Sequence, residues 1–332
     1  MPHHRLASRT TTFLVFPIAA ALGLVVAGCS EISPTAPTTA GKLDVMAPNF
    51  DRSTPTFSYA TIDAPGAILT NAQGINAGGD IAGWYLDAAQ RFHGFVVHDG
   101  TFSTVDYPSE QSGVVEQTQV RGIGADGAVV GNHWNNGELA ANPAADHGFE
   151  RTAAGEFQIV HYPDHLNEIP QRILPDGTIL GCRHDMDMMA SMHGIVIAGN
   201  SATDIGVPAS MNNGSTPSGR LQVGFFTDMA NVTHGYTIEN GAFTPFMVPG
   251  SSATNAWDVS PRGDIVGAYK NATGFHGFVE TDAGYTTIDM PVAGTTATRV
   301  FGVNARGDVV GAYVVGTGAK AVTHAFVATR VQ

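Results

Sequence analysis

The sequence RVFGVNARGDVVGAY at residues 299–313 predicts two short β-strands joined by a tight turn, because branched apolar residues flank a turn-forming Asn-Ala-Arg-Gly-Asp segment. A close copy, AWDVSPRGDIVGAY, occupies residues 256–269. Six such hairpins align on a closing glycine at intervals of 43 to 50 residues, and these glycines are Gly83, Gly131, Gly181, Gly224, Gly267 and Gly311. A period in this range is typical of a repeat protein.

Each repeat continues beyond its hairpin with two further strand signals. A short variable loop leads to a triplet that begins with histidine, and a last apolar run ends at proline, as in FSTVDYP (102–108) and YTTIDMP (285–291). The triplets are His93-Gly94-Phe95, His147-Gly148-Phe149, His193-Gly194-Ile195, His234-Gly235-Tyr236, His276-Gly277-Phe278 and His324-Ala325-Phe326. Four strands in a period in the forties predict the blades of a β-propeller. The triplet histidine, repeated in every unit, is best interpreted as a buried hydrogen-bond anchor.

The number and closure of the blades follow from where the repeats begin and end. The segment FSYATIDAP (57–65) matches a fourth strand but precedes the first hairpin, whereas the last repeat stops at HAFVATRVQ without a fourth strand. We therefore predict an all-β, six-bladed β-propeller of four-stranded blades over residues 57–332. The N-terminal strand would complete the last blade and cover an otherwise open sheet edge.

The repeat also suggests a family. The pattern Gly-Ile/Val-Asn-x-x-Gly-Asp-Ile/Val-Val-Gly, followed by His-Ala/Gly-Phe, resembles the HAF-type repeat family of bacterial extracellular proteins. His324-Ala325-Phe326 matches the name-giving triplet, four other copies have His-Gly-aromatic, and the third copy departs at Ile195. The resemblance covers nearly all of residues 57–330. It implies an exported repeat protein and assigns no biochemical activity.

The N-terminus carries a separate signal. A basic segment, MPHHRLASR, precedes an apolar run that ends in small residues directly before Cys29. This arrangement resembles the signal peptide of bacterial lipoproteins, which implies removal of residues 1–28 and lipidation of Cys29; a plain secretory peptide with an incidental cysteine is the alternative. Residues 29–56, rich in Pro, Thr and Ser, would form a flexible tether. The expected location is the bacterial cell envelope, as an outer-membrane lipoprotein or at the cell surface.

Charge and cysteine content limit the partners. The chain has 29 Asp and Glu against 16 Lys and Arg, a net charge of −13, and it has no basic stripe to neutralise phosphates. Nucleic acid is therefore excluded as a partner, whereas a membrane (through the lipid), a glycan, a peptide or a surface protein fits. With Cys29 lipidated, Cys182 would be the remaining thiol, so the fold would have no internal disulfide.

Departures from the repeat indicate where a ligand could bind. In the second and third repeats the loops after the hairpin read NHWNNGELAANPAAD (132–146) and CRHDMDMMASM (182–192). Because neighbouring blades present such loops on one face, we expect a common rim there. The candidate rim residues are His133, Trp134, Glu138, Tyr162, Arg183 and His184.

Two chemistries suit this rim. Imidazole and carboxylate groups could hold a divalent metal ion, with His161, His165, His184, Asp185 and Asp187 as candidate ligands. Alternatively, Trp134, Tyr162 and Trp257 could offer flat apolar faces to a sugar or peptide. Long solvated loops without a ligand are the third interpretation.

An enzyme is the alternative to a binding module. The sequence has no G-x-S-x-G, H-E-x-x-H or Gly-rich phosphate motif. A propeller lyase or hydrolase, metal-dependent or not, would still assemble its groups from separate blades and leave no linear motif. Under that interpretation we expect the catalytic groups among Arg183, His184, His133 and Glu138.

Overall fold

The computed structural model describes residues 54–108, 116–135, 137, 145–163, 165, 167–185 and 191–331. Three of the predicted site residues, Cys29, Glu138 and Asp187, lie outside these residues, as do the signal peptide and nearly all of the tether. The described part of the chain consists of β-strands with one 3₁₀ turn, Gly318–Lys320. In that part, no helix has the length and apolar character needed to cross a membrane.

Four separate antiparallel sheets, each with its strands in chain order, follow one another along the chain. The first contains β2 (Leu69–Ile75), β3 (Ile81–Leu86), β4 (Phe92–His98) and β5 (Thr101–Val105). The second contains β6 (Glu116–Ile123), β7 (Val129–Asn135), β8 (His147–Arg151) and β9 (Phe157–Val160). The third contains β10 (Asn167–Ile173), β11 (Ile179–His184), β12 (His193–Ala198) and β13 (Ser201–Pro208). The fourth contains β14 (Ser210–Ser215), β15 (Leu221–Thr227), β16 (Thr233–Glu239) and β17 (Ala242–Phe246).

The remaining strands form one eight-stranded sheet that holds the fifth and sixth repeats. The fifth repeat supplies β18 (Ala253–Val259), β19 (Ile265–Asn271), β20 (Gly274–Thr281) and β21 (Gly284–Ile288). The sixth supplies β22 (Thr295–Val303), β23 (Val309–Val315) and β24 (Val322–Val331). The two groups meet at a single parallel bridge between Phe275 and Ala297. The N-terminal β1 (Thr56–Thr61) pairs antiparallel with β24, from Thr56 opposite Val331 to Thr61 opposite Phe326.

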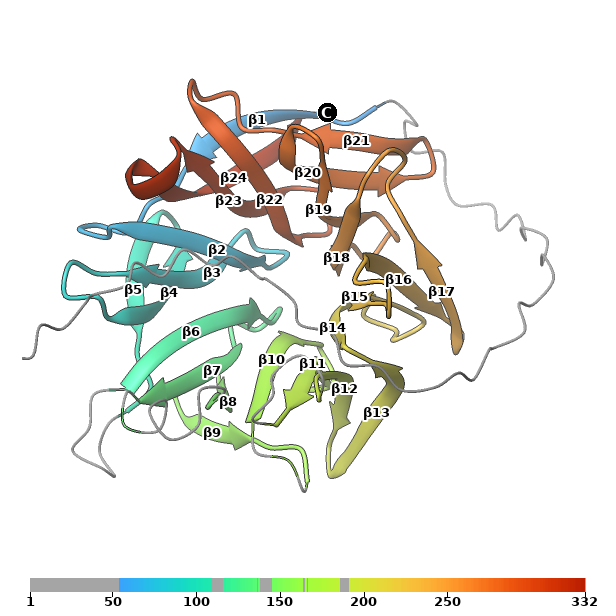
Figure 1. Ribbon diagram of the computed structural model, residues 1–332. Coiled ribbons are helices and arrows are strands. Elements are labelled where there is room, and N and C mark those ends of the chain that lie inside the picture. Colours follow the sequence, from blue (N-terminus) through green and yellow to red (C-terminus); the bar gives the residue numbers. More distant parts are fainter. Residues whose placement is uncertain are drawn as a thin grey trace, which may run out of the picture. The chain divides into compact units, whose positions relative to one another are not determined.

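Figure 1 shows the strand groups arranged around a central axis, with β2, β6, β10, β14, β18 and β22 innermost. The architecture is an all-β β-propeller with four-stranded blades, as the repeat period predicts. Four of these blades are separate sheets, and the strands expected for the last two lie in the eight-stranded sheet.

Tight packing explains the glycine that closes each hairpin. A Cβ atom at Gly311 would lie 1.9 Å from the carbonyl oxygen of Arg299 on the paired strand, and at Gly267 it would lie 2.0 Å from that of Asn255. Any side chain at these positions would push the two inner strands apart. The same close approach recurs at Gly83, Gly131, Gly181 and Gly224.

Turn geometry explains the rest of the hairpin motif. The turn glycine has a positive φ, for example 86° at Gly307. The side-chain oxygen of Asn304 accepts hydrogen bonds from the backbone N–H groups of Arg306 and Asp308. The repeated Asn-x-x-Gly-Asp sequence thus satisfies its own turn.

The centre of the ring is held by an ion pair. Each innermost strand has a register shift at the same point, and the residue after it is glycine in four repeats but Arg172 in the third and Asp258 in the fifth. Arg172 Nε lies 3.3 Å from Asp258 Oδ2, and both side chains are at most a tenth exposed. The Arg172 guanidinium also donates to backbone carbonyl oxygens of four innermost-strand residues, Gln73, Arg121, Gln171 and Phe301.

Asp258 completes this central network. Its Oδ1 accepts the N–H of Val259, and its Oδ2 accepts the N–H of Val303 on β22 at 3.1 Å. Burial raises the pKa of Asp258, and the charge of Arg172 opposes this effect. The pair therefore ties the innermost strands of five repeats to one another.

Replacing Arg172 tests this arrangement. We expect Arg172→Met to lower the free energy of unfolding by about 3–5 kcal/mol, because it leaves a buried carboxylate and four carbonyl groups without their donor. Urea unfolding monitored by circular dichroism would measure the change. Arg220→Ala is the control, since the Arg220–Glu239 pair is 3.9 Å apart and more than half exposed, and should change the value by no more than about 0.5 kcal/mol. Equal losses in the two variants would contradict a central role for Arg172.

Candidate functional site

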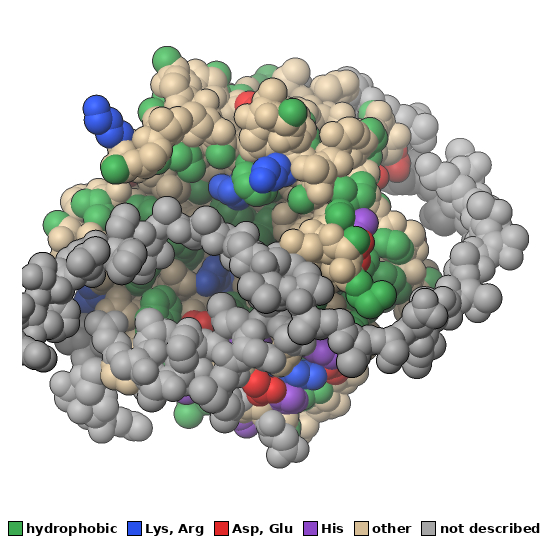
Figure 2. Space-filling view, viewed as in Figure 1, with side chains coloured by type: hydrophobic (Ala, Val, Ile, Leu, Met, Phe, Trp, Pro, Cys, Tyr) green, Lys and Arg blue, Asp and Glu red, His purple; other side chains and the backbone are tan. Residues whose placement is uncertain are grey.

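In Figure 2, acidic, basic and histidine side chains gather on the face in view near the sheet of β10–β13. Of the predicted rim residues that the structure describes, His133 and Trp134 lie near the end of β7, Tyr162 follows β9, and Arg183 and His184 end β11. The candidate site consists of departures from a pattern of contacts that the repeats share.

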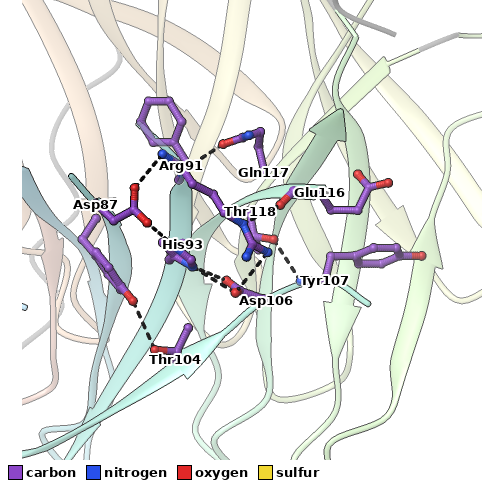
Figure 3. Close-up of polar contacts among 11 residues, drawn as sticks. Asp87, Arg91, His93, Thr104, Asp106, Tyr107, Glu116, Gln117 and Thr118 are labelled. Atoms are coloured by element: carbon purple, nitrogen blue, oxygen red, sulfur yellow. Dashed lines mark hydrogen bonds and ion pairs between the residues drawn. The ribbon is translucent and has the colours of Figure 1, made fainter. Parts of the chain in front are cut away.

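In the common pattern, the triplet histidine joins the third strand of a blade to the fourth. In the first blade, His93 Nδ1 lies 2.9 Å from Asp106 Oδ2 and its Nε2 lies 3.3 Å from Asp87 Oδ2, as Figure 3 shows. The ring of Tyr85 on β3 stacks on His93 at 4.9 Å. Corresponding histidine–aspartate pairs join His193 to Asp204, His276 to Asp289 and His324 to Asp63. These contacts agree with the interpretation of the triplet histidine as a hydrogen-bond anchor, but the triplet histidines are partly exposed and not buried as predicted.

A second shared contact joins each blade to the next. The N–H of Tyr107, next to Asp106, donates to Thr118 Oγ1 on β6 at 2.9 Å (Figure 3). Ala64, Val248 and Met290 donate in the same way to Thr70, Thr254 and Thr298. A buried hydroxyl on the innermost strand is thus part of the scaffold.

The second blade departs first at His133, which occupies the position of Tyr85. Its Nδ1 lies 3.1 Å from Glu116 Oε2, and its ring stacks on Tyr107 with the centroids 3.5 Å apart. Both His133 and Glu116 are less than a tenth exposed. The predicted rim residue His133 is therefore held between a carboxylate and an aromatic ring.

The junction of the second and third blades differs from the common pattern at two positions. His161 stands where the first blade has Asp106, and Glu168 stands where the next strand usually has threonine. His161 Nδ1 lies 2.9 Å from Glu168 Oε1, which also accepts the N–H of Tyr162 at 3.0 Å. Burial raises the pKa of Glu168, while the Tyr162 N–H and His161 oppose the shift. A histidine and a carboxylate thus replace the usual aspartate and threonine at the contact between these two blades.

Behind this junction lies a buried polar group around Asp146. Asp146 Oδ1 accepts a hydrogen bond from Asn132 Nδ2 at 2.5 Å, and Asn132 Oδ1 accepts one from Arg121 Nε at 3.0 Å. His184, which is fully buried, places Nε2 3.9 Å from Asp146 Oδ2. Burial raises the pKa of Asp146 to about 6, although Arg121, Asn132 and His147 act in the opposite direction. The sequence placed His184 and the loop that ends at Asp146 at the rim, but it did not indicate Arg121, which breaks no recognisable motif.

The remaining predicted residues divide into local pairs. Arg183 Nη2 lies 2.9 Å from Asp204 Oδ2, and its Nη1 donates to the carbonyl of Ser191. His165 Nδ1 lies 3.3 Å from Asp185 Oδ1.

The predicted metal ligands thus form separate pairs in the described part of the chain, and these pairs do not come together as one ligand set. Within the described ranges, no group of three or more His, Cys, Asp or Glu side chains could hold a metal ion. Since Asp187 lies outside these ranges, the metal site stays a prediction.

An aromatic cluster lies at the boundary of the first two blades, and of its members the sequence analysis selected Trp134 but not Trp84 or Phe92. The rings of Trp84 and Phe92 lie 5.4 Å apart, and those of Phe92 and Trp134 lie 5.6 Å apart. All three side chains are partly exposed. Trp84 lies within a repeated hairpin, and the sequence therefore indicated a structural role for it. Of the other predicted aromatic residues, Tyr162 contacts His165, and Trp257 packs between Phe225 and Phe301.

Amide side chains line the innermost strands next to this cluster. On β6, Gln117, Gln119 and Arg121 alternate and thus share one strand face, and Arg121 Nη2 donates to Gln119 Oε1. On β2, Gln73 Nε2 donates to Asn71 Oδ1 at 2.6 Å. The positions that correspond to Gln119 on β10 and β14 hold Ile169 and Met211. At this position the lining is therefore an amide on the first, second and fifth blades, apolar on the third and fourth, and Arg299 on the sixth.

A pocket of about 150 Å³ lies at the other end of the innermost strands, among the hairpin turns. Arg172 and Asp258 contribute to its wall, together with turn residues of all six hairpins, which include Ala77, Ala125, Pro175, Pro217, Pro261 and Ala305. These turn residues are small and apolar, so this end of the axis differs in character from the amide-lined end.

The comparisons with known proteins concern the fold. No protein-family model matches the chain, and no curated protein matches it. Among solved structures, TolB from Acinetobacter baumannii is 13% identical with a TM-score of 0.50, over 77% of this chain and 65% of TolB. A gluconolactonase from Xanthomonas campestris is 12% identical with a TM-score of 0.49, over 83% of this chain and 90% of its own. The β-propeller domain of the Trilobed protease from Pyrococcus furiosus is 8% identical with a TM-score of 0.49, over 80% and 96%. Such low identities concern the fold alone and assign no activity.

The raised pKa of Asp146 predicts how stability changes with pH. The folded protein binds a proton at Asp146 up to about pH 6, whereas the unfolded chain releases it near the ordinary value of 3.8. Between pH 4 and 6 the unfolded state therefore holds fewer protons at this group, and its ionisation lowers stability as the pH rises, by up to about 2–3 kcal/mol.

Asp146→Asn should remove this loss. We expect the variant to gain stability relative to the wild type as the pH rises from 4 to 6, measured by urea unfolding at each pH. Asp282→Asn, at an exposed carboxylate, should follow the wild-type profile. Parallel curves for wild type and Asp146→Asn would show that Asp146 is not the group responsible.

Proposed function

We propose that the chain is an exported, lipid-anchored, six-bladed β-propeller that acts as a binding or interaction module. The count of six is supported by the single bridge between Phe275 and Ala297, since the two halves of the eight-stranded sheet are otherwise antiparallel four-stranded units like the other blades. The pairing of β1 with β24 supports closure of the last blade by the N-terminal strand.

The resemblance to HAF-type repeats and to lipoprotein signal peptides supports the location. An acylated Cys29 would hold the propeller at the outer membrane or cell surface through the tether. The proposed partners are the membrane, which the lipid would contact, and a glycan, peptide or surface protein, which would bind at the candidate rim.

One observation carries the proposed binding role: on the innermost strand of the second blade, three alternate positions of one strand face are polar. A blade needs a buried hydroxyl and a histidine–aspartate pair for its scaffold, yet β6 adds Gln117, Gln119 and Arg121. These side chains are held by partners within the protein, as Arg121 is by Gln119 and Asn132. Polar groups fixed in this way lose little conformational freedom when a ligand binds, so they suit recognition.

A propeller lyase or hydrolase is the second candidate, and the Asp146 group favours it. A carboxyl group with a pKa of about 6 can donate and accept a proton near neutral pH, and His184 lies 3.9 Å away. The Arg121 side chain could stabilise negative charge in a reacting group. Asp146→Asn would abolish such an activity but leave simple binding largely intact.

The lipid anchor can be tested by counting thiols. The sequence has two cysteines. Burial raises the pKa of Cys182 to about 12, so the native protein should react slowly with a thiol reagent such as dithionitrobenzoate. After denaturation, protein purified from membranes should expose one thiol, because thioether formation blocks Cys29. Two thiols would argue against lipidation, and Cys29→Ser should move the protein from the detergent phase to the aqueous phase.

The binding role can be tested by thermal unfolding of the full chain in detergent. The panel contains neutral oligosaccharides, short peptides and divalent cations, each at saturating concentration. A ligand present at 100 times its Kd stabilises the native state by about 2.7 kcal/mol, so we expect at least one class to raise the midpoint.

The rise should be smaller in Gln119→Ala and unchanged in Asn255→Ala, the corresponding position on β18. A panel without any effect on the wild type would remove support for a small-ligand module. A rise of the same size in Gln119→Ala would move the site away from the second blade.

A further inference from the structure

We propose that the Trp84–Phe92–Trp134 cluster is a subsite for one ring of a neutral glycan, with the amides of β2 and β6 as its hydrogen-bond partners. This inference rests on the proposed binding function and names its ligand class. Of the three aromatic residues that the sequence suggested, Trp134, Tyr162 and Trp257, it keeps Trp134, and it places the platform at the boundary of the first and second blades.

The cluster has the form of a platform rather than of a closed core. Trp84 on β3 and Phe92 on β4 belong to the first blade, and Trp134 on β7 belongs to the second. The successive rings are inclined by 67° and 50°, and each side chain keeps part of its surface exposed. By contrast, the ring stack of Tyr107 on His133 is closed at 3.5 Å and has no room for a ligand. Exposed aromatic faces that bridge two blades are available to the apolar face of a sugar ring.

Each tryptophan has an amide as its cross-strand neighbour. Asn71 on β2 lies opposite Trp84, and Gln117 on β6 lies opposite Trp134. Side chains in such positions lie side by side on one sheet face. An aromatic ring beside an amide is the pairing that a sugar needs, since its ring carbons are apolar and its hydroxyls are polar.

The hydrogen bonds of these amides leave donors for a ligand. Gln117 Oε1 accepts the N–H of Phe92 at 2.8 Å, and this contact fixes the amide with its NH₂ group as a donor (Figure 3). Asn71 Oδ1 accepts from Gln73, which fixes the Asn71 amide in the same way. The indole Nε1–H of Trp84 is buried and has no acceptor within the described residues. A ring of sugar hydroxyls supplies acceptors for donors of this kind.

The charge around the cluster favours a neutral ligand. Arg91 is paired with Asp106 at 3.3 Å, and Arg121 shares its donors with Gln119 and Asn132. Neither cation is thus placed as a free charge for a phosphate or carboxylate ligand, and the chain as a whole is acidic. An uncharged oligosaccharide avoids the desolvation cost of an ion, and it is not repelled by the net negative charge of the chain.

Tryptophan fluorescence gives a direct test, because the chain has three tryptophans and two of them belong to the cluster. In Trp257→Phe, the emission comes from Trp84 and Trp134 alone. We titrate this full-length variant, in detergent, with cellohexaose, chitohexaose, maltohexaose and xylohexaose. At least one hexaose should change the emission in a saturable manner and with the same Kd as it has for the wild type by calorimetry.

Site variants locate the binding. Trp134→Ala should raise the Kd about tenfold, while Trp134→Phe should restore most of the affinity because it keeps an aromatic face. Gln117→Met, which keeps the side-chain length but loses the NH₂ donor, should also weaken binding and serves if Trp134→Ala fails to fold. Lys270→Ala, at the position on β19 that corresponds to Trp134, is the control and should bind as the wild type does.

The outcomes separate this inference from the proposed function. If none of the four hexaoses binds, but a peptide or cation raises the unfolding midpoint in a Gln119-dependent way, the glycan class is wrong and the binding module stands. If a hexaose binds with unchanged affinity to Trp134→Ala and Gln117→Met, the glycan class stands and the subsite is wrong. If no ligand of any class binds, both proposals fall.

Discussion

The structure depends on one buried ion pair, Arg172 with Asp258, at the point where the innermost strands come closest. The backbone bulges there in each repeat, and glycine is the residue that usually permits the approach, as at Gly122, where a Cβ would lie 2.4 Å from the carbonyl oxygen of Gln171. A ring made of glycine alone would leave converging carbonyl groups without donors. Arg172 supplies donors to four of them, and Asp258 balances its charge. An ion pair of this kind is costly to desolvate, and its many hydrogen bonds are what make it tolerable.

This arrangement shows how a repeat protein becomes asymmetric without losing its scaffold. The identical contacts, such as His93 with Asp106 and Tyr107 with Thr118, maintain the spacing of each blade from the next. Positions that those contacts do not use are free to differ. At the second junction, His161 replaces the usual aspartate and Glu168 replaces the usual threonine, and the two side chains contact each other, which shows that the contact between neighbouring blades can be rebuilt with other residues. The residues that all repeats share therefore set the spacing of the blades, and the positions that differ between repeats provide the polar and aromatic side chains of the candidate site.

The limits of the sequence follow from the same division. The period, the closing glycines and the unpaired fourth strand predicted the propeller architecture and the pairing of the first strand with the last, since both follow from local strand and turn chemistry. The sequence also directed attention to the second and third repeats, where His133, His161 and His184 do make buried or partly buried contacts with carboxylates. It could not find the Arg172–Asp258 pair, because the two residues lie in repeats that are not neighbours and meet only when the ring is complete. The role of Trp84 could not be found for the same reason. Its ring contacts Phe92, which in turn contacts Trp134 on another blade.

The central pair and the proposed binding face are connected through the innermost strands. Arg172 contacts the carbonyl oxygens of Gln73 and Arg121, and the side chains of these two residues lie with Asn71 and Gln119 in the amide lining. The same pair forms part of the wall of the pocket among the hairpin turns. The two ends of the axis are thus separated by a charged contact with many hydrogen bonds, with the hairpin turns on one side and amides on the other. A polar ligand that approaches along the axis finds amide partners on these strands, and the ion pair keeps the strands that carry those amides in register. The contact that closes the ring therefore also prepares the face on which recognition is proposed to occur.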